Sequence, residues 1–278
     1  MAPATSATDP APSSGESSTA GASRPAPVLP LTQRLSKLVI SAQFLWFLGH
    51  LTTVIQTLVY VLYARFASTD GGAKAYAKAY YGTLLSYGII MFKAHGNPQI
   101  SMGYLTNVLR DENSWYFLSA LYWVTSKPLV ATLFPYVTFS LFHSLNYIRS
   151  DVLPALLPPS TSSITPKIRD TILRLVKTYQ HTALRYVAYV EVWTIMPVVT
   201  IGVLFGWTSF FAPLMYARFL MFRYHSSPLT EQAFVELRQK LDATASDPRV
   251  PAIVKKFYEG ARDAVIKSGA VPTAPAPQ

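Results

Sequence analysis

The sequence predicts an all-α polytopic membrane protein made of helical hairpins, with amphipathic helices at its C-terminal end. Apolar residues make up 50% of the 278 residues and only 14% carry charge, against about 25% in soluble domains. Long stretches almost free of charge recur along the chain, and roughly 20 apolar helical residues cross a hydrocarbon core about 30 Å thick. A single stretch of this kind is typical of a soluble core helix as well, but three in one chain indicate membrane helices.

Four apolar blocks define the predicted membrane domain, residues 31–217. The blocks cover residues 38–64, 76–92, 115–148 and 186–217. Residues 1–30 and 269–278 consist mainly of small residues and proline, which cannot bury enough apolar area to offset the entropy of ordering. Both ends are therefore predicted to be disordered tails, and residues 218–268 a cytosolic region of amphipathic helices.

The first two blocks are separated by Gly71 and Gly72, which predict a turn. The second block is short, and it crosses the bilayer only if Lys74 and Lys78 extend their amines to the interface. The segment from Pro98 to Leu109 then predicts a short interfacial helix.

The third block contains one charged residue, Lys127, followed by Pro128. Proline disfavours helix in the residue before it, and an ammonium at the bilayer centre costs about 2.5 to 3.5 kcal/mol on insertion scales. A hairpin with Lys127 at a hydrated tip avoids both costs. One long kinked span would instead carry the basic residues of 149–185 across the membrane, which the positive-inside rule disfavours.

The fourth block is divided by Gly202, Gly206 and their polar neighbours, and it has Arg185 and Arg218 at its ends. We therefore predict three hairpins, with both termini and the 149–185 loop in the cytosol. The arms of the last hairpin are expected to be too short to cross fully, so that the hairpins act as wedges in one leaflet. A single tilted crossing of either later block is the alternative, and it would change the sidedness.

Two amphipathic helices are predicted after Arg223. The first has an apolar stripe at helical spacing that includes Leu229, Ala233 and Leu237. The second has an apolar stripe flanked by basic residues, as expected for a helix lying in a membrane interface or binding a partner. Docking of these helices on the protein's own membrane domain is a compatible alternative. The candidate membrane- or partner-binding residues of the second helix are Ile253, Val254, Lys255, Lys256, Phe257, Ala261, Arg262 and Val265.

The sequence contains no motif that predicts an enzyme, a metal site or a cofactor. Cysteine is absent, which excludes disulfides, thiol catalysis and S-palmitoylation, and the five histidines lack metal-ligand spacing. Two polar residues lie inside apolar blocks. We expect His143 to make an interhelical hydrogen bond, and Glu191 to have a structural or a functional role. The net charge of +10 is spread along the loops, which favours anionic lipid headgroups over nucleic acid.

Several ordered motifs of the later blocks resemble the transmembrane protein 33 family, which includes the Krüppel homologue 2 proteins and the fungal pore-membrane proteins of the Pom33/Per33 type. The resemblance covers about residues 35–267. The motifs are Phe134-Pro135, Phe139-Ser140-Leu141 with His143 and Tyr147, Glu191 with Met196-Pro197, Arg218-Phe219-Leu220, Arg223-Tyr224 with Ser226, and Phe234 with Glu236-Leu237-Arg238.

The resemblance implies a multi-pass protein of the endoplasmic reticulum membrane and nuclear envelope, without known catalysis. It implies association with reticulon-type membrane-shaping proteins and, in fungi, with nuclear pore components or an importin. We therefore predict a non-enzymatic protein that shapes or stabilises curved membrane and supports tubule organisation and nuclear pore assembly or distribution. The alternative is a transporter or channel that uses Glu191 and His143, and a lipid-modifying enzyme that depends on His143 is a third class.

Overall fold

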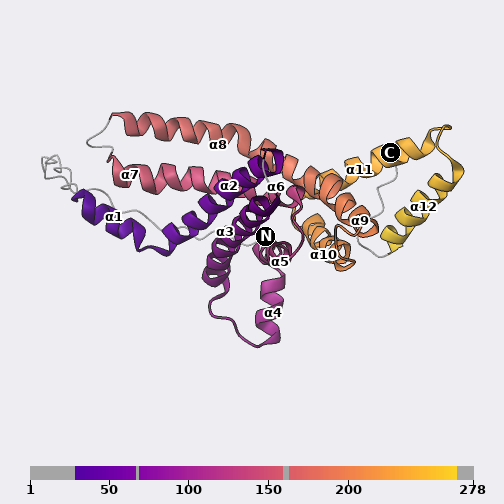
Figure 1. Cartoon of the computed structure of the whole chain (residues 1–278), viewed down its shortest axis with the longest axis horizontal. Helices are drawn as coiled ribbons and strands as arrows, with labels where there is room; N and C mark the ends of the chain where they lie inside the picture. The colour runs from indigo at the N-terminus through magenta and orange to yellow at the C-terminus, as the bar shows by residue number, and fades with distance from the viewer. Residues whose placement is uncertain (1–28, 67–68, 159–162, 268–278) are drawn as a thin grey trace, which may run out of the picture.

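The computed structural model describes residues 29–66, 69–158 and 163–267, and within these ranges all regular structure is helical (Figure 1). This confirms the predicted all-α class. The two predicted tails lie outside the described residues, apart from Leu29 and Pro30. The helices before residue 157 are α1 (Leu31–Val39), α2 (Ala42–Phe66), α3 (Thr69–His95), α4 (Met102–Leu109), α5 (Glu112–Val124), α6 (Val130–Tyr147), the π-helix η1 (Ile148–Val152) and α7 (Leu153–Leu156). They are followed by α8 (Ile164–Tyr189), the π-helix η2 (Val190–Ile195), α9 (Met196–Leu204), α10 (Phe211–Ser226), α11 (Pro228–Ser246) and α12 (Ala252–Lys267).

Helices α2 and α3 form the first hairpin, and two glycines bring their backbones into close contact. A Cβ atom on Gly49 would lie 2.7 Å from the carbonyl oxygen of Gly82, and one on Gly82 would lie 2.6 Å from that of Gly49. Hydroxyl groups bond across the contact, since Thr53 donates to the carbonyl of Ala79 at 3.1 Å. Small residues and hydroxyls of this kind are how membrane helices associate without a hydrophobic driving force.

The predicted turn at Gly71–Gly72 is wrong, because both residues lie inside α3. Their lack of side chains serves packing, since a Cβ on Gly71 would lie 2.8 Å from the ring of Tyr63 in α2. Helix α2 ends at Phe66 and α3 begins at Thr69, so the two helices are connected before the glycines.

Helices α5 and α6 form the second hairpin, and its turn lies where the sequence predicts it. The hydroxyls of Thr125 and Ser126 both donate to the carbonyl of Tyr122, at 2.9 and 2.8 Å, and so satisfy the end of α5. Helix α6 begins at Val130, two residues after Pro128.

The third hairpin differs from its prediction in two ways. Its first arm is not short, because α8, η2 and α9 run on as one helical stretch, Ile164–Leu204, of 41 residues. The predicted 149–185 loop is therefore largely helical, and its apolar residues, such as Ile168 and Ile172, recur at helical spacing among the charges. The turn to α10 is made at Gly206, whose φ of +67° suits glycine.

Two helical stretches among the described residues are long and apolar enough to cross a membrane, judged by length and composition. They are Ala42–Tyr63, in α2, and Ile164–Leu204. The other hairpin helices are shorter or carry more polar residues, and each packs against one of these two or against a neighbouring hairpin.

All three hairpins point the same way. The connected ends of their helices lie toward one end of the body, here the tip end, near which the hydroxyls of Tyr76 and Tyr80 lie 3.0 and 2.8 Å from Oγ1 of Thr132. Lys127 Nζ joins the second tip to the third by donating to the carbonyl of Gly206 at 2.8 Å.

The opposite, or base, end gathers the outer ends of the same helices. There Lys93 Nζ donates to Oε1 of Gln43 at 2.7 Å, which joins α3 to α2. His95 at the end of α3 lies 2.9 Å from Asp111, the residue before α5. Between the two ends the core is strongly aromatic, with buried Tyr76, Tyr80, Tyr87, Tyr116, Trp123, Tyr136 and Tyr216.

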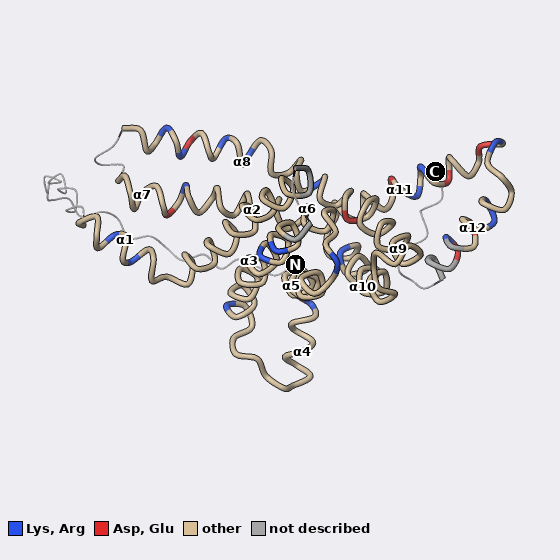
Figure 2. Tube along the Cα trace, viewed as in Figure 1, with Lys and Arg blue, Asp and Glu red and all other residues tan. Residues whose placement is uncertain are grey.

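Two groups of helices extend from this hairpin body. Helices α1 and α7 lie beside the start of α8 at one end of the long axis, and α12 lies at the other (Figure 1). Figure 2 shows Lys and Arg residues along α1, α8 and α12, so that much of the positive charge lies away from the centre of the body.

Candidate functional sites in the hairpin body and the C-terminal helices

Glu191 lies in η2 and is completely buried. Its Oε1 accepts a hydrogen bond of 2.7 Å from the hydroxyl of Tyr116 in α5, and its Oε2 accepts one of 3.3 Å from Nε of Arg223 in α10. The π-helix itself, a form found in proteins mostly as single turns, starts one residue before Glu191. The carboxylate therefore joins three helices at one point.

Arg223 completes what we call the ion cluster, made of Glu112, Tyr116, Glu191 and Arg223. Its Nη1 pairs with Glu112 at the start of α5, and its guanidinium carbon lies 5.4 Å from the centre of the Tyr116 ring. Only 5% of Arg223 is exposed. A buried charge is tolerated when it is paired and hydrogen-bonded, and removal of one partner typically costs about 3 to 5 kcal/mol.

The contacts of Glu191 favour a structural role for this residue. Both carboxylate oxygens already accept hydrogen bonds from groups on neighbouring helices. The arrangement can hold α5, η2 and α10 together near the base end. In the sequence Arg223 stands out only as part of the Arg223-Tyr224 motif, and no local pattern pairs it with a carboxylate 32 residues away.

The interhelical hydrogen bond expected of His143 is made by His50 instead. His50 in α2 is completely buried, and its Nδ1 lies 2.9 Å from Oγ of Ser140 in α6. His143 is exposed on α6, with its ring centre 4.8 Å from that of His50 and 5.2 Å from that of Trp46. Within the described ranges no hydrogen bond or ion pair joins His143 to Glu191. The sequence feature that could have identified His50 as the hydrogen-bonding histidine is its place in an apolar block beside Gly49.

Metal ligands are also not clustered in this part of the molecule. Among the described residues, no group of three or more His, Asp or Glu side chains is placed to hold a metal ion.

Helix α11 is docked on the hairpin body. Its Ala233 is completely buried, and the indole Nε1 of Trp193 donates to the Ala233 carbonyl at 2.9 Å. Lys240 Nζ lies 4.5 Å from the centre of the Trp193 ring. Tyr189 donates to Glu236, and this hydrogen bond, with the nearby Arg185, lowers the pKa of the Glu236 carboxyl.

Helix α12 contacts α11 through polar side chains. The hydroxyl of Tyr258 donates to Asp242 at 2.8 Å, and Arg262 pairs with the same carboxylate at 3.3 Å. Partial burial and the Asp242 hydrogen bond raise the pKa of Tyr258 to about 12. Arg262, expected to face a membrane or a partner, is therefore engaged within the protein.

An adjoining side of α12 is apolar and uncovered. Ile253 is 78% exposed, Val254 51% and Phe257 79%. Beside them, Lys256 is exposed and Lys255 is partly buried. The side chains of Ala261 and Val265, the remaining members of the predicted stripe, lie outside the described part of the helix. We call Ile253, Val254 and Phe257 the α12 apolar face.

The family model described as Transmembrane protein 33/Nucleoporin POM33 matches residues 30–271 of the chain. The chain belongs to this family. The match confirms the resemblance drawn from the motifs of the later blocks, and it agrees with a polytopic helical membrane protein. No solved structure matches the chain.

Similar family members come from fungi. The chain is 26% identical over 254 residues to Tetra-spanning protein 1 of Schizosaccharomyces pombe, with 88% of this chain and 90% of that protein covered. It is 27% identical over 261 residues to the Pore membrane protein of 33 kDa of Saccharomyces cerevisiae, with 89% and 91% covered. It is 23% identical over 267 residues to the Pore and endoplasmic reticulum protein of 33 kDa of the same yeast, with 86% and 94% covered. The names of these relatives indicate no catalytic activity.

Proposed function

We propose that the protein shapes or stabilises curved membrane of the endoplasmic reticulum and nuclear envelope without catalysing a reaction. In this role it supports tubule organisation and the assembly or distribution of nuclear pore complexes. The names of two relatives, a pore membrane protein and a pore and endoplasmic reticulum protein, support the location. The observation that carries the mechanism is the α12 apolar face, exposed next to lysines.

The hairpin body acts as a wedge in this proposal. Helix α5 has 13 residues and α10 has 16, which correspond to lengths of about 20 and 24 Å. Both are shorter than the hydrocarbon core of about 30 Å. Because all three hairpins enter from the base end, these short arms reach the opposite headgroup layer only where the bilayer thins around them, and they add more of their volume to the leaflet at the base end.

Helix α12 acts as an interfacial anchor. Full burial of one large aliphatic or aromatic side chain is worth about 1.5 to 3 kcal/mol, so the three side chains of the α12 apolar face supply a substantial binding energy. Each lysine near an anionic surface adds about 1 kcal/mol. Lys255 and Lys256 give the helix this preference for anionic lipid, and they are also the residues offered to an acidic partner. Reticulon-type proteins, nuclear pore components and an importin are the partner classes that we propose.

The test compares full-length protein reconstituted into anionic liposomes with the double variant Val254→Asp/Phe257→Asp. Electron microscopy should show narrow tubules with the unaltered protein and fewer or wider ones with the variant. Val235→Asp is the control for adding one such charge elsewhere, because Val235 is 43% exposed on the neighbouring helix α11. Tubulation that is equal in the double variant and the unaltered protein would reject the role of α12.

The alternative function, a transporter or channel that uses Glu191 and His143, makes a different prediction in the same liposomes. It requires solute or ion flux that is lost on Glu191→Gln. The hydrogen bonds that occupy Glu191 do not favour it. Tubulation without flux supports membrane shaping, and lipid turnover that disappears on replacement of His143 would favour the enzymatic class.

A further inference from the structure

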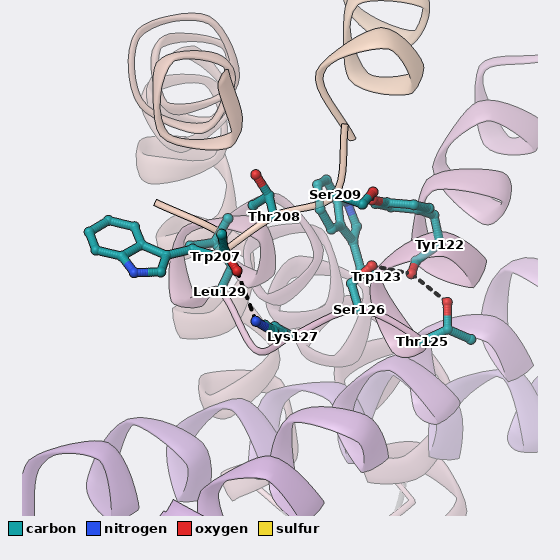
Figure 3. Close-up of a pocket in the computed structure, with 10 residues that line it drawn as sticks. Tyr122, Trp123, Thr125, Ser126, Lys127, Leu129, Trp207, Thr208 and Ser209 are labelled. Carbon is teal, nitrogen blue, oxygen red and sulfur yellow. Dashed lines mark hydrogen bonds between the residues drawn. The ribbon is translucent and has the colours of Figure 1, made fainter. Parts of the chain in front are cut away.

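The tips of the second and third hairpins enclose a hollow of about 410 Å³ at the tip end of the body (Figure 3). We call it the tip hollow. Figure 3 shows Lys127 extending from the α5–α6 turn toward the backbone next to Trp207, with Tyr122 and Ser209 lying next to one another. The residues that line it are Tyr122, Trp123, Thr125, Ser126, Lys127, Leu129, Gly206, Trp207, Thr208 and Ser209.

The tip hollow has the chemistry of a site for an oxyanion such as phosphate. Lys127 is the only charged residue among those that line it. Its ammonium has three N–H donors, and the bond to the Gly206 carbonyl uses one of them. The hydroxyls of Tyr122 and Ser209 lie 2.7 Å apart, and whichever of them donates in that pair, one hydroxyl hydrogen remains for a ligand.

The surroundings of the tip hollow are those of a lipid headgroup layer. Large apolar side chains of the third tip are exposed beside it, and two of them, Phe205 and Trp207, stack with ring centres 5.0 Å apart. Aromatic rings concentrate where hydrocarbon meets headgroups, so acyl chains can lie against this surface while a headgroup enters the hollow. The exposed side chains are Leu204, Phe205, Trp207, Phe210 and Phe211.

We propose that the tip hollow binds the phosphate of a phospholipid headgroup, with Lys127 as its cation. The lipid belongs to the leaflet at the tip end, opposite the leaflet that α12 contacts in the proposed function. Because the hollow is formed by two hairpins, a bound lipid contacts both tips and opposes their separation. Free phosphate has the same recognisable group, but it lacks acyl chains for the exposed aromatic surface.

A purely structural account of Lys127 gives a distinct expectation. In that account the ammonium serves only to satisfy the Gly206 carbonyl after α9. Lys127→Gln distinguishes phosphate binding from this structural role, because the glutamine amide still donates to a carbonyl but carries no charge. Lys127→Arg keeps the charge. Lys93→Gln is the matched control, since Lys93 is an exposed lysine at the base end that also donates to one neutral oxygen.

The experiment is a lipid titration of the full-length protein in detergent, followed by native mass spectrometry. Dioleoyl phosphatidic acid is the probe, and dioleoylglycerol supplies the same acyl chains without phosphate. The unaltered protein, Lys127→Arg and Lys93→Gln should bind phosphatidic acid about tenfold more tightly than dioleoylglycerol, as expected for a charge-assisted hydrogen bond. Lys127→Gln should lose that difference while its melting temperature stays unchanged.

Three results would overturn the proposal. They are equal binding of the two lipids by the unaltered protein, an undiminished preference in Lys127→Gln, and displacement of phosphatidic acid by inorganic phosphate at an equal concentration. If Lys127→Gln does not fold, the unaltered protein still gives an answer. Its preference for phosphatidic acid should fall as NaCl rises from about 50 to about 500 mM, because salt screens the ammonium, and a constant preference would contradict the assignment.

Discussion

Helices α11 and α12 are neighbours of similar length, 19 and 16 residues, and both are amphipathic, yet only α11 buries its apolar side on the hairpin body. Helix α11 meets the body at the fully buried Ala233. Helix α12 leaves Ile253 and Phe257 exposed. An amphipathic pattern therefore predicts that a helix has an apolar side. The size and polarity of particular residues then decide what covers that side.

The cause of the difference lies in the residues that make each contact. Ala233 is small, so the backbone of α11 approaches close enough for Trp193 to donate to the Ala233 carbonyl. The contact of α12 with α11 uses polar groups, Tyr258 and Arg262 on Asp242, which turns the apolar side of α12 outward. This outward side is what the proposed membrane anchor requires.

The largest expected effect separates the body from α12. Arg223→Ala leaves Glu191 buried without its cation, and we expect it to destabilise the hairpin body and the docked α11 by about 3 to 5 kcal/mol. Thermal unfolding in detergent measures this loss. Arg218→Ala, an exposed arginine on the same helix, is the control and should change little.

If Arg223→Ala also abolished lipid contact by α12 at temperatures where the body stays folded, the two regions would not be independent. The comparison between a docked and an undocked helix would then fail.

The next effect acts on the docked helix alone. Ala233→Trp overfills the contact with Trp193, and overpacking of this kind costs about 1 to 3 kcal/mol. We expect α11 to detach, which limited proteolysis detects as faster cleavage after Ser226. Val235→Trp places the same ring on the exposed side of α11, and cleavage at an equal rate in both variants would argue against docking through Ala233.

A smaller effect concerns the charge of α12. Lys255→Gln/Lys256→Gln should weaken its contact with anionic vesicles by about 2 kcal/mol, at about 1 kcal/mol for each lysine. Protection of α12 from protease in proteoliposomes reports the contact. Vesicles of neutral lipid are the control, and an equal loss of protection on both lipids would show that the lysines act through folding of the helix.

These regions differ in how much of them the sequence predicts. The turn at Lys127–Pro128 was predicted correctly, because proline geometry and the cost of a buried ammonium both act locally. Gly71–Gly72 was interpreted as a turn because glycine favours turns, whereas here it permits close packing on Tyr63. The basic residues of 149–185 suggested a loop, although the apolar residues among them follow a helical period.

The ion cluster and the docking of α11 depend on tertiary contacts. Glu191 was singled out from the sequence, but its partners Tyr116 and Arg223 are 75 and 32 residues away. Ala233 is one of several apolar residues in its stripe, and the sequence does not indicate that Trp193 lies above it. Composition and periodicity predict helices and their apolar sides, while the partners of buried charges follow from the packing of hairpins.

The smallest effect is the pH dependence of the α11–α12 contact. Partial burial alone would raise the pKa of Asp242, but hydrogen bonds from Tyr258 and Arg262 outweigh it and lower this pKa below its ordinary 3.8. Because the folded pKa is below the unfolded one, the stabilisation is present above about pH 4 and is lost as pH falls through the folded value.

Asp242 is 39% exposed, so its pairing is worth at most about 1 kcal/mol. Asp242→Asn should slightly raise the hydrogen-exchange rate of α12 amides at pH 7. In this variant the stability of the α11–α12 contact should no longer fall as the pH is lowered. A large loss of stability of the whole protein would contradict this assignment.

The contact of the α12 apolar face with lipid is the central claim, and an introduced probe tests it directly. The chain contains no cysteine, so a fluorophore on Phe257→Cys or on Val235→Cys is the single label in full-length protein reconstituted into anionic vesicles. Lipids that carry a quencher in the acyl region should quench the label at 257 strongly and the label at 235 weakly. Equal, weak quenching at both positions would mean that α12 does not enter the bilayer, and the proposed anchor would be wrong.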